Sequence, residues 1–124
     1  MNVKKLKEAM EVLKSEAGSG LIGTDIYSSK DLQSIVAYNG TPEACALFGK
    51  ITEYLKKALN NAGFPALNNY YLLDLVGDAI LIVIPFGEYQ WGMVLSTKEI
   101  PLGMFLNIIL PKITSAFEEA LVSN

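Results

Sequence analysis

The chain of 124 residues contains no histidine, no arginine and only one cysteine, Cys45. Ordinary zinc sites, Ser-His-Asp or Cys-His catalysis and disulfide bonds each require residues that are missing. Bidentate recognition of guanine or phosphate also lacks its residue, because lysine supplies only a point charge. We therefore expect no catalytic residues, no metal site, no cofactor and no enzymatic activity.

Charge and long apolar runs are also scarce. Charged residues make up 19% of the chain and the net charge is -3, so we expect no nucleic-acid partner. The longest apolar run without charge, residues 100–111, is too short to span a bilayer, so we expect no direct membrane insertion. The first fourteen residues carry four lysines and two glutamates, which is unlike a signal peptide. Together with the lone cysteine, these features predict a cytoplasmic protein.

Hydrophobic residues make up 51% of the chain, and the mean hydropathy is +0.30. This composition predicts a single domain over residues 1–124 with a well-filled core. The apolar surplus must lie between layers that are covered on both sides, or on a surface that meets a partner.

Two helices have clear boundaries. Apolar residues at alternating spacings of three and four predict a helix from Val3 until Gly18-Ser19-Gly20 ends it. A second helix is expected after Asn39-Gly40, where Thr41 can cap it and proline occupies the first helical position. It should run to about Ala62, before a glycine and a proline.

A last helix is predicted from about Leu102 to Val122. Pro111 lies inside it and cannot donate a hydrogen bond to the carbonyl of Asn107. We therefore expect a kink at this point, or two shorter helices that are broken there.

Five strands are predicted from alternating or continuous apolar segments, at residues 21–27, 32–38, 70–76, 79–84 and 90–97. Both alternating faces of residues 79–84 are apolar, so both faces of the sheet must be covered. The chain order is then α-β-β-α-β-β-β-α. It predicts an α+β fold with a five-stranded antiparallel sheet and helices on both faces.

This order and four local motifs resemble the Roadblock dynein-light-chain domain, a relative of the longin and profilin-like folds. The motifs are residues 18–27, 39–41, 76–87 and 102–103. Residues 28–31 and Pro111 depart from the family pattern. The resemblance implies a homodimer, or a heterodimer with a paralogous Roadblock domain, in which the middle helices pack together and the third strands pair. It also implies a scaffold or regulator of a small Ras-like GTPase that is not itself an enzyme.

The middle helix has two distinct faces on a helical wheel. One face should lie on the sheet and consists of Ala44, Phe48, Ile51, Leu55, Leu59 and Ala62. A neighbouring flank is the candidate dimer surface, or else the edge of a wide core stripe; it consists of Leu47, Tyr54, Ala58 and Asn61. Tyr70, Leu72 and Asp74 join it as candidate dimer contacts on the third strand, an apolar edge that invites pairing unless a loop or helix covers it.

Candidate contacts for another partner lie on the exposed side of the same helix, at Lys50, Glu53, Lys56 and Lys57. Ordinary solvation of these side chains is the alternative. Many GTPase activators insert an arginine, which this chain lacks. Any effect on GTP hydrolysis would have to come from reordering the GTPase's own residues.

Other functional readings stay open. Pro111 and Asn107 motivate a profilin-like or longin-like sensor with a small-molecule pocket between the sheet and the kinked last helix. The Cys45 thiol could have a lowered pKa at the start of the middle helix, or Cys45 is simply a small residue at a crowded position. No acid-base or metal role is expected for four aspartates, Asp25, Asp31, Asp74 and Asp78, because no two of them lie in a metal-loop pattern. Asp31 and Asp78 should serve turns, and Asp74 should either guard the edge against uncontrolled pairing or face water. Trp91 should be buried with Met93 and Leu95, and Tyr89 should be exposed.

Overall fold

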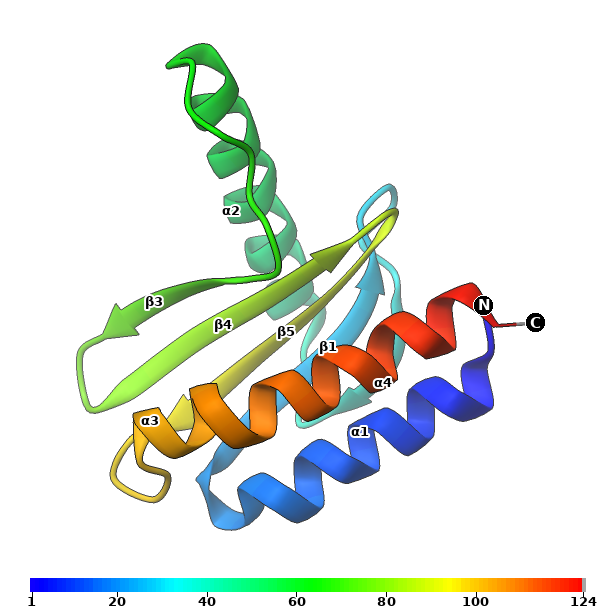
Figure 1. The fold of residues 1–124 in the computed structure, drawn as a ribbon, viewed down its shortest axis with the longest axis vertical. Coiled ribbons are helices and arrows are strands. Elements are labelled where there is room, and N and C mark those ends of the chain that lie inside the picture. The colour runs from blue at the N-terminus through cyan, green and yellow to red at the C-terminus, as the bar shows by residue number, and fades with distance from the viewer. Residues whose placement is uncertain (124) are drawn as a thin grey trace.

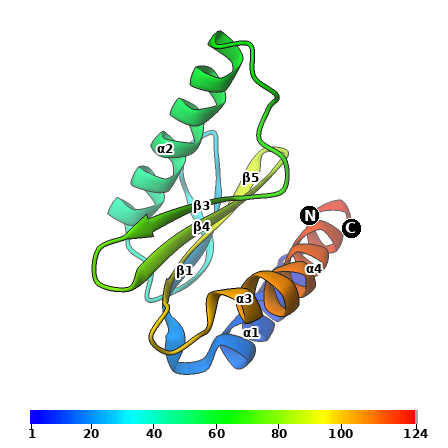
Figure 2. The same ribbon diagram turned by 60° about the vertical axis from the view of Figure 1, so that its left-hand side comes forward.

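The computed structural model describes residues 1–123 and has three layers. Helices α1 (Val3–Ala17) and α4 (Leu110–Val122) run side by side across one face of a sheet (Figure 1). Helix α2 (Pro42–Asn61) lies on the opposite face, as the turned view in Figure 2 shows. The α+β architecture with helices on both faces, predicted from the sequence, is therefore confirmed.

The sheet is antiparallel throughout, and its order is β2-β1-β5-β4-β3. Strands β2 and β3 are therefore the two edges. The strands span Leu21–Ser28 (β1), Ser34–Tyr38 (β2), Tyr71–Leu75 (β3), Ala79–Phe86 (β4) and Tyr89–Ser96 (β5).

Leu32 does not begin the second strand, contrary to the prediction. It has a left-handed backbone with φ of 58°. Its N–H donates to the carbonyl of Ser28 at 2.9 Å, so it belongs to the β1–β2 turn. Its side chain occupies the space that a Cβ on Gly49 of α2 would need. A contact between a loop and a helix therefore overrides the local strand pattern.

Strand β4 continues through Pro85 and ends at Phe86, two residues beyond its predicted end at residue 84. Strand β3 pairs with β4 only as far as Val83, so the missing N–H of Pro85 costs no hydrogen bond with β3.

The last helix is continuous across Pro111. The alternative of two shorter helices broken at this residue is therefore wrong. After α3 (Leu102–Met104), a π-helical turn, η2 (Phe105–Ile109), leads directly into α4. The N–H of Leu110 donates to the carbonyl of Phe105, five residues back. This widened turn immediately precedes the proline and is a known way for a helix to absorb a local irregularity.

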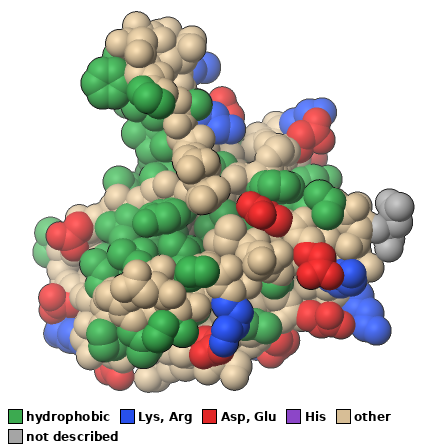
Figure 3. Space-filling model, viewed as in Figure 1, with side chains coloured by type: hydrophobic (Ala, Val, Ile, Leu, Met, Phe, Trp, Pro, Cys, Tyr) green, Lys and Arg blue, Asp and Glu red, His purple; other side chains and the backbone are tan. Residues whose placement is uncertain are grey.

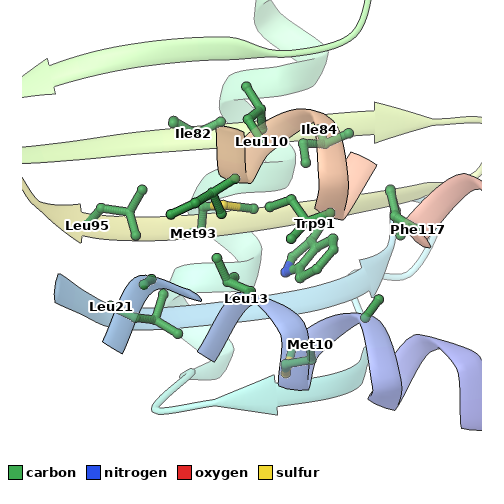
Figure 4. Close-up of a cluster of buried hydrophobic side chains, with 14 of the residues drawn as sticks. Met10, Leu13, Leu21, Ile82, Ile84, Trp91, Met93, Leu95, Leu110 and Phe117 are labelled. Carbon is green, nitrogen blue, oxygen red and sulfur yellow. The ribbon is translucent and has the colours of Figure 1, made fainter. Parts of the chain in front are cut away.

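The larger core lies between the sheet and helices α1 and α4. Trp91 is fully buried at its centre, with its ring centroid 5.5 Å from that of Phe117 (Figure 4). Its indole N–H donates to the hydroxyl of Thr24 at 2.7 Å. Met93 and Leu95 are buried beside it, as predicted. Tyr89 is half-buried against this core rather than exposed, because β5 begins at that residue.

The smaller core lies between the sheet and the first half of α2. The buried residues of α2 are Cys45, Phe48, Gly49 and Thr52. Thr41 caps the helix as predicted, with its hydroxyl accepting from the N–H of Ala44. The predicted contact of α2 with the sheet is wrong at the C-terminal end of the helix, where Leu59 is half-buried and Ala62 is exposed. A helix of 20 residues is about 30 Å long, more than the strands beneath it can cover, so α2 projects past the sheet (Figure 1).

Candidate functional site

Strand β3 presents an open edge. Within residues 1–123 it pairs only with β4. Tyr70 and Asp74, two of the predicted dimer contacts, are exposed, and Leu72 is half-buried. Val76, predicted as the last residue of this strand, lies in the β3–β4 turn instead and is 102% exposed. An apolar edge that ends in a fully exposed valine is a surface suited to pairing.

The flank of α2 that was predicted to meet a partner is exposed in this chain. Leu47 is 52% exposed and Tyr54 is 72% exposed. Ala58 and Asn61 are exposed as well, so the flank is not part of a wide core stripe. Phe64, just past the end of α2, is 65% exposed and was missed by the sequence analysis. Its position between Gly63 and Pro65, in a segment that cannot continue the helix, was the available signal.

Apolar side chains gather on the surface around these elements. Figure 3 shows them over β3 and α3 and again at the projecting end of α2. Tyr70, Leu75, Leu102 and Met104 are among the exposed large hydrophobic residues. Scattered apolar residues are normal on a protein surface, but a gathered patch is typical of an interaction site.

A groove of about 340 Å³ separates α2 from the β1–β2 turn. We call it the lysine groove; it is lined by Ser29, Lys30, Leu32, Gly49, Lys50, Glu53, Tyr54 and Lys57. Three of the four predicted partner contacts, Lys50, Glu53 and Lys57, therefore lie together. The fourth, Lys56, is half-buried and lines a different hollow with Leu67 and Pro85.

A buried polar cluster lies beneath the start of α2. Asp25 is almost completely buried, and its Oδ1 accepts a hydrogen bond from Ser34 Oγ at 2.7 Å. Burial raises the pKa of Asp25, while hydrogen bonds from Cys45 and Ser34 oppose the rise. A Cβ on Gly40 would lie 2.7 Å from Asp25 Oδ2, so that carboxylate approaches the chain where α2 begins.

The Cys45 thiol is not activated. Burial raises its pKa to about 12, and the neighbouring Asp25 adds to the rise. The thiol therefore stays protonated at neutral pH, which is opposite to the lowered pKa that the helix N-terminus might have given. Cys45 is a small buried residue at a crowded position.

Two further polar contacts lie in the small core. The Tyr27 hydroxyl donates to Gln90 Oε1 at 2.6 Å, and the hydroxyls of Thr52 and Tyr71 lie 2.7 Å apart. Burial raises the pKa of both tyrosines. Gln90 Nε2 is buried and has no hydrogen-bond partner among the described residues. The interface of α2 with the sheet is thus partly polar and not fully satisfied.

The other carboxylates have local structural contacts. Asp31 Oδ1 accepts from the N–H of Gln33. Asp78 has a positive φ in the β3–β4 turn, where its carbonyl accepts from Thr97. In the part of the chain that the structure describes, no group of three or more His, Cys, Asp or Glu could hold a metal ion. No helix within residues 1–123 is both long and apolar enough to cross a bilayer.

The predicted small-molecule pocket has only a partial counterpart. Buried side chains of α4, η2 and the sheet fill the layer between them (Figure 4). An open hollow of about 290 Å³ lies on the outer side, beside Pro111 and Leu110 and next to Tyr70. Asn107 does not line it.

Comparisons with solved structures place this arrangement among known folds. MglB of Myxococcus xanthus superposes with a TM-score of 0.73 at 13% identity, over 98% of this chain and 93% of that one. An MglB described with a tetrameric arrangement has a TM-score of 0.63 at 12% identity, over 95% and 85% of the two chains. A Roadblock/LC7 domain from Streptomyces avermitilis has a TM-score of 0.59 at 10% identity, over 84% and 88%.

No family model and no curated protein matches the sequence. At these identities the likeness extends to the fold and not to particular side chains. With the strand order, the two-helix layer and the opposing α2 all in place, the chain has a Roadblock-like fold.

Proposed function

We propose that this protein is a non-enzymatic dimeric adaptor, formed by two copies or by one copy and a paralogous Roadblock domain, that binds a small Ras-like GTPase. The observation that carries the proposal is the joint exposure of the β3 edge and the α2 flank. Leu47 and Tyr54 are exposed on α2, and within residues 1–123 β3 pairs only with β4. An exposed apolar helix flank together with an unpaired strand edge matches the dimer that the Roadblock resemblance implies.

A two-fold axis restricts how β3 can pair with a second copy. Residues paired across the axis must lie on the same face, so the axis passes through a residue position rather than between two. An axis at Leu73 pairs all five residues of β3, with Tyr71 opposite Leu75 and Leu72 opposite Asp74. An axis at Asp74 would set two carboxylates directly opposite each other, which is destabilising. We therefore place the axis at Leu73.

This register accounts for Val76. Val76 would lie opposite Tyr70 of the second copy, and Tyr70 borders the hollow beside Pro111. The contact that covers the exposed Val76 of one copy would then also cover the hollow beside Pro111 of the other copy. The register thus covers the exposed Val76 side chain and the hollow beside Pro111, both of which the isolated chain leaves open to water.

The GTPase part of the proposal rests on the family resemblance and on the lysines of α2. Because the chain has no arginine, it would act by positioning the GTPase or its residues rather than by stabilising transferred phosphate directly. Binding to such a GTPase would place the protein in the cytoplasm.

Dimerisation is tested by sedimentation equilibrium at tens of micromolar. We expect twice the monomer mass for the wild type and a shift toward monomer for Tyr54→Asp, which introduces charge on the exposed flank. Lys4→Asp on the solvent face of α1 is the matched control and should leave the mass unchanged. A monomeric wild type, or an unchanged mass for Tyr54→Asp, would contradict the proposed dimer.

The GTPase partner is tested by recovery from native lysate, with and without a non-hydrolysable GTP analogue. We expect a Ras-like protein whose recovery depends on the nucleotide. Identification by mass spectrometry is followed by titration of the purified GTPase into the adaptor. Equal recovery in both conditions, or no GTPase among the recovered proteins, would contradict this part of the proposal.

A further inference from the structure

We infer that the lysine groove binds an acidic segment of a partner protein and takes one large apolar side chain of that segment between α2 and the β1–β2 turn. This inference rests on the proposed role of α2 as a partner-binding element and adds the chemistry of what is bound. The groove shares Tyr54 with the proposed dimer flank, whereas its other lining residues lie on the β1–β2 side of α2 rather than at the β3 edge.

The floor of the groove is apolar and is fixed by unusual local structure. Leu32 adopts a left-handed backbone, a conformation that costs about 1–2 kcal/mol for a residue other than glycine. Hydrogen bonds between Ser28 and the residues that close the turn hold it in place. Gly49 leaves the space that the Leu32 side chain occupies. Tyr54, exposed on the next turn of α2, adds an aromatic wall.

The rim of the groove is positively charged, although the chain as a whole carries a net charge of -3. Lys30 pairs with Glu88 at 2.7 Å, which ties the β1–β2 turn to the β4–β5 turn. Lys50 and Lys57 are exposed and make no ion pair with any residue from 1 to 123. Glu53 lines the groove and Glu88 is paired with Lys30, which leaves Lys50 and Lys57 as rim cations without an ion pair among the described residues. Charge complementarity selects a negatively charged partner.

The size and charge pattern favour a protein segment over an anionic bilayer. A volume of about 340 Å³ is at the lower end of ligand pockets and suits a side chain with its neighbours. Membrane-surface elements need a broad apolar face flanked by many cations. Here Glu53 and Glu88 lie among the lysines and would repel a uniformly anionic surface, whereas a peptide can place its carboxylates between them.

The probe for the test is a pair of capped peptides, Glu-Asp-Phe-Asp-Glu and Glu-Asp-Ala-Asp-Glu, titrated into nitrogen-15-labelled protein. Amide shifts are followed by two-dimensional NMR, which localises weak binding. We expect saturable shifts at residues 29–32 and 49–57 with the phenylalanine peptide. Binding should be about tenfold weaker with the alanine peptide, because the loss of a buried aromatic contact removes the apolar anchor.

Two matched charge reversals test the rim. Lys50→Glu with Lys57→Glu should weaken binding of the phenylalanine peptide at least tenfold, and added salt should weaken it in the wild type. Lys4→Glu with Lys7→Glu on α1 makes the same change in net charge and should leave binding unchanged. Tyr54→Ala should weaken binding without unfolding the chain, because Tyr54 is exposed.

Four results of the titrations would overturn the inference. These are no saturable shifts with either peptide up to about 1 mM, shifts centred elsewhere, equal binding of the two peptides, or equal losses in the two charge-reversed proteins. Co-sedimentation with phosphatidylserine vesicles but no peptide binding would identify a bilayer as the ligand and would also overturn it. Sedimentation on the same samples separates the two proposals: peptide binding by a monomer contradicts only the dimer, and a dimer without peptide binding contradicts only the groove.

Discussion

The two faces of the sheet differ in what fills them. On the α1 and α4 side, Trp91 belongs to a cluster of twenty buried apolar residues within residues 1–123, and its indole N–H is satisfied by Thr24. On the α2 side, the buried apolar set has six members, and two of these are tyrosines. Asp25, Thr52 and Gln90 lie buried in the same layer, and Gln90 Nε2 lacks a partner among the described residues.

This difference assigns most of the folding stability to one face of the sheet and the candidate interaction surfaces to the other. Buried apolar area is the main favourable term in folding, so most of the stability should come from the α1 and α4 face. Helix α2 is held on the sheet by its residues up to Thr52, and no described residue of α2 beyond Thr52 is buried. The face that contributes less to folding is therefore the one that presents the β3 edge, the α2 flank and the lysine groove.

The largest expected effect is truncation of the larger core. Phe117→Ala should lower the free energy of unfolding by about 3–5 kcal/mol, because Phe117 is fully buried against Trp91. Phe48→Ala in the smaller core should cost less, since the part of α2 around it can settle into the space. Urea unfolding followed by circular dichroism measures both. Equal or reversed losses would contradict the assignment of stability to the α1 and α4 face.

A smaller effect is expected from crowding the α2 face. A Cβ on Gly92 of β5 would meet the ring of Phe48, including Cε2 at 2.8 Å. Gly92→Ala should therefore lower the free energy of unfolding by about 1–3 kcal/mol and speed amide exchange in α2. Gly103→Ala is the control, because no atom lies within 4 Å of its Cβ position. Equal free energies of unfolding for the two variants would mean that the Phe48 ring can shift without cost, and would contradict tight packing of α2 against β5.

The smallest effect concerns Asp25 and appears as a dependence on pH. Because burial raises its folded-state pKa above the ordinary value of 3.8, ionisation of the Asp25 carboxyl costs more free energy in the folded protein than in the unfolded chain. Its contribution to stability is complete below the unfolded pKa and is lost as pH rises through the folded pKa. Asp25→Asn should therefore gain stability relative to wild type from about pH 4 upward, by about 1.4 kcal/mol for each unit of the shift.

This prediction is measured by urea unfolding at a series of pH values from about 3 to 8. Asp31→Asn, an exposed aspartate on the β1–β2 turn, is the control. A stability difference for Asp25→Asn that does not vary with pH, or one that falls as pH rises, would contradict the proposed cost of its ionisation.

Much of the fold was predictable, because it follows from short-range patterns. The cap at Thr41, the stop at Gly18 and the apolar strand 79–84 each act within one element, and all three are in place. The places of Leu32 and Tyr89 were predicted wrongly, and so was the sheet contact of Leu59 and Ala62 near the end of α2. The conformation and burial of these residues depend on contacts that no local pattern encodes, such as the packing of the Leu32 side chain against Gly49.

The candidate site was only partly predictable for the same reason. Helical spacing indicated Leu47 and Tyr54 as an exposed flank, since they lie away from the apolar stripe. Spacing on α2 could not place Lys30 beside Lys50 and Lys57, because Lys30 comes from a separate turn. Val76 was expected at the end of the third strand, but its full exposure in the β3–β4 turn depends on how β3 and β4 pair and not on the apolar run that contains it.

The central claim, that the β3 edge pairs with a second copy about Leu73, is tested most directly by disulfide cross-linking. In a Cys45→Ser background, Leu73→Cys should form a covalent dimer on mild oxidation, because directly opposed residues have Cβ atoms about 4.5–5.5 Å apart. Leu72→Cys should cross-link far less, since its copies would then be diagonal neighbours at about 7–8 Å. Efficient cross-linking of Leu72→Cys but not of Leu73→Cys, or of neither, would contradict the account.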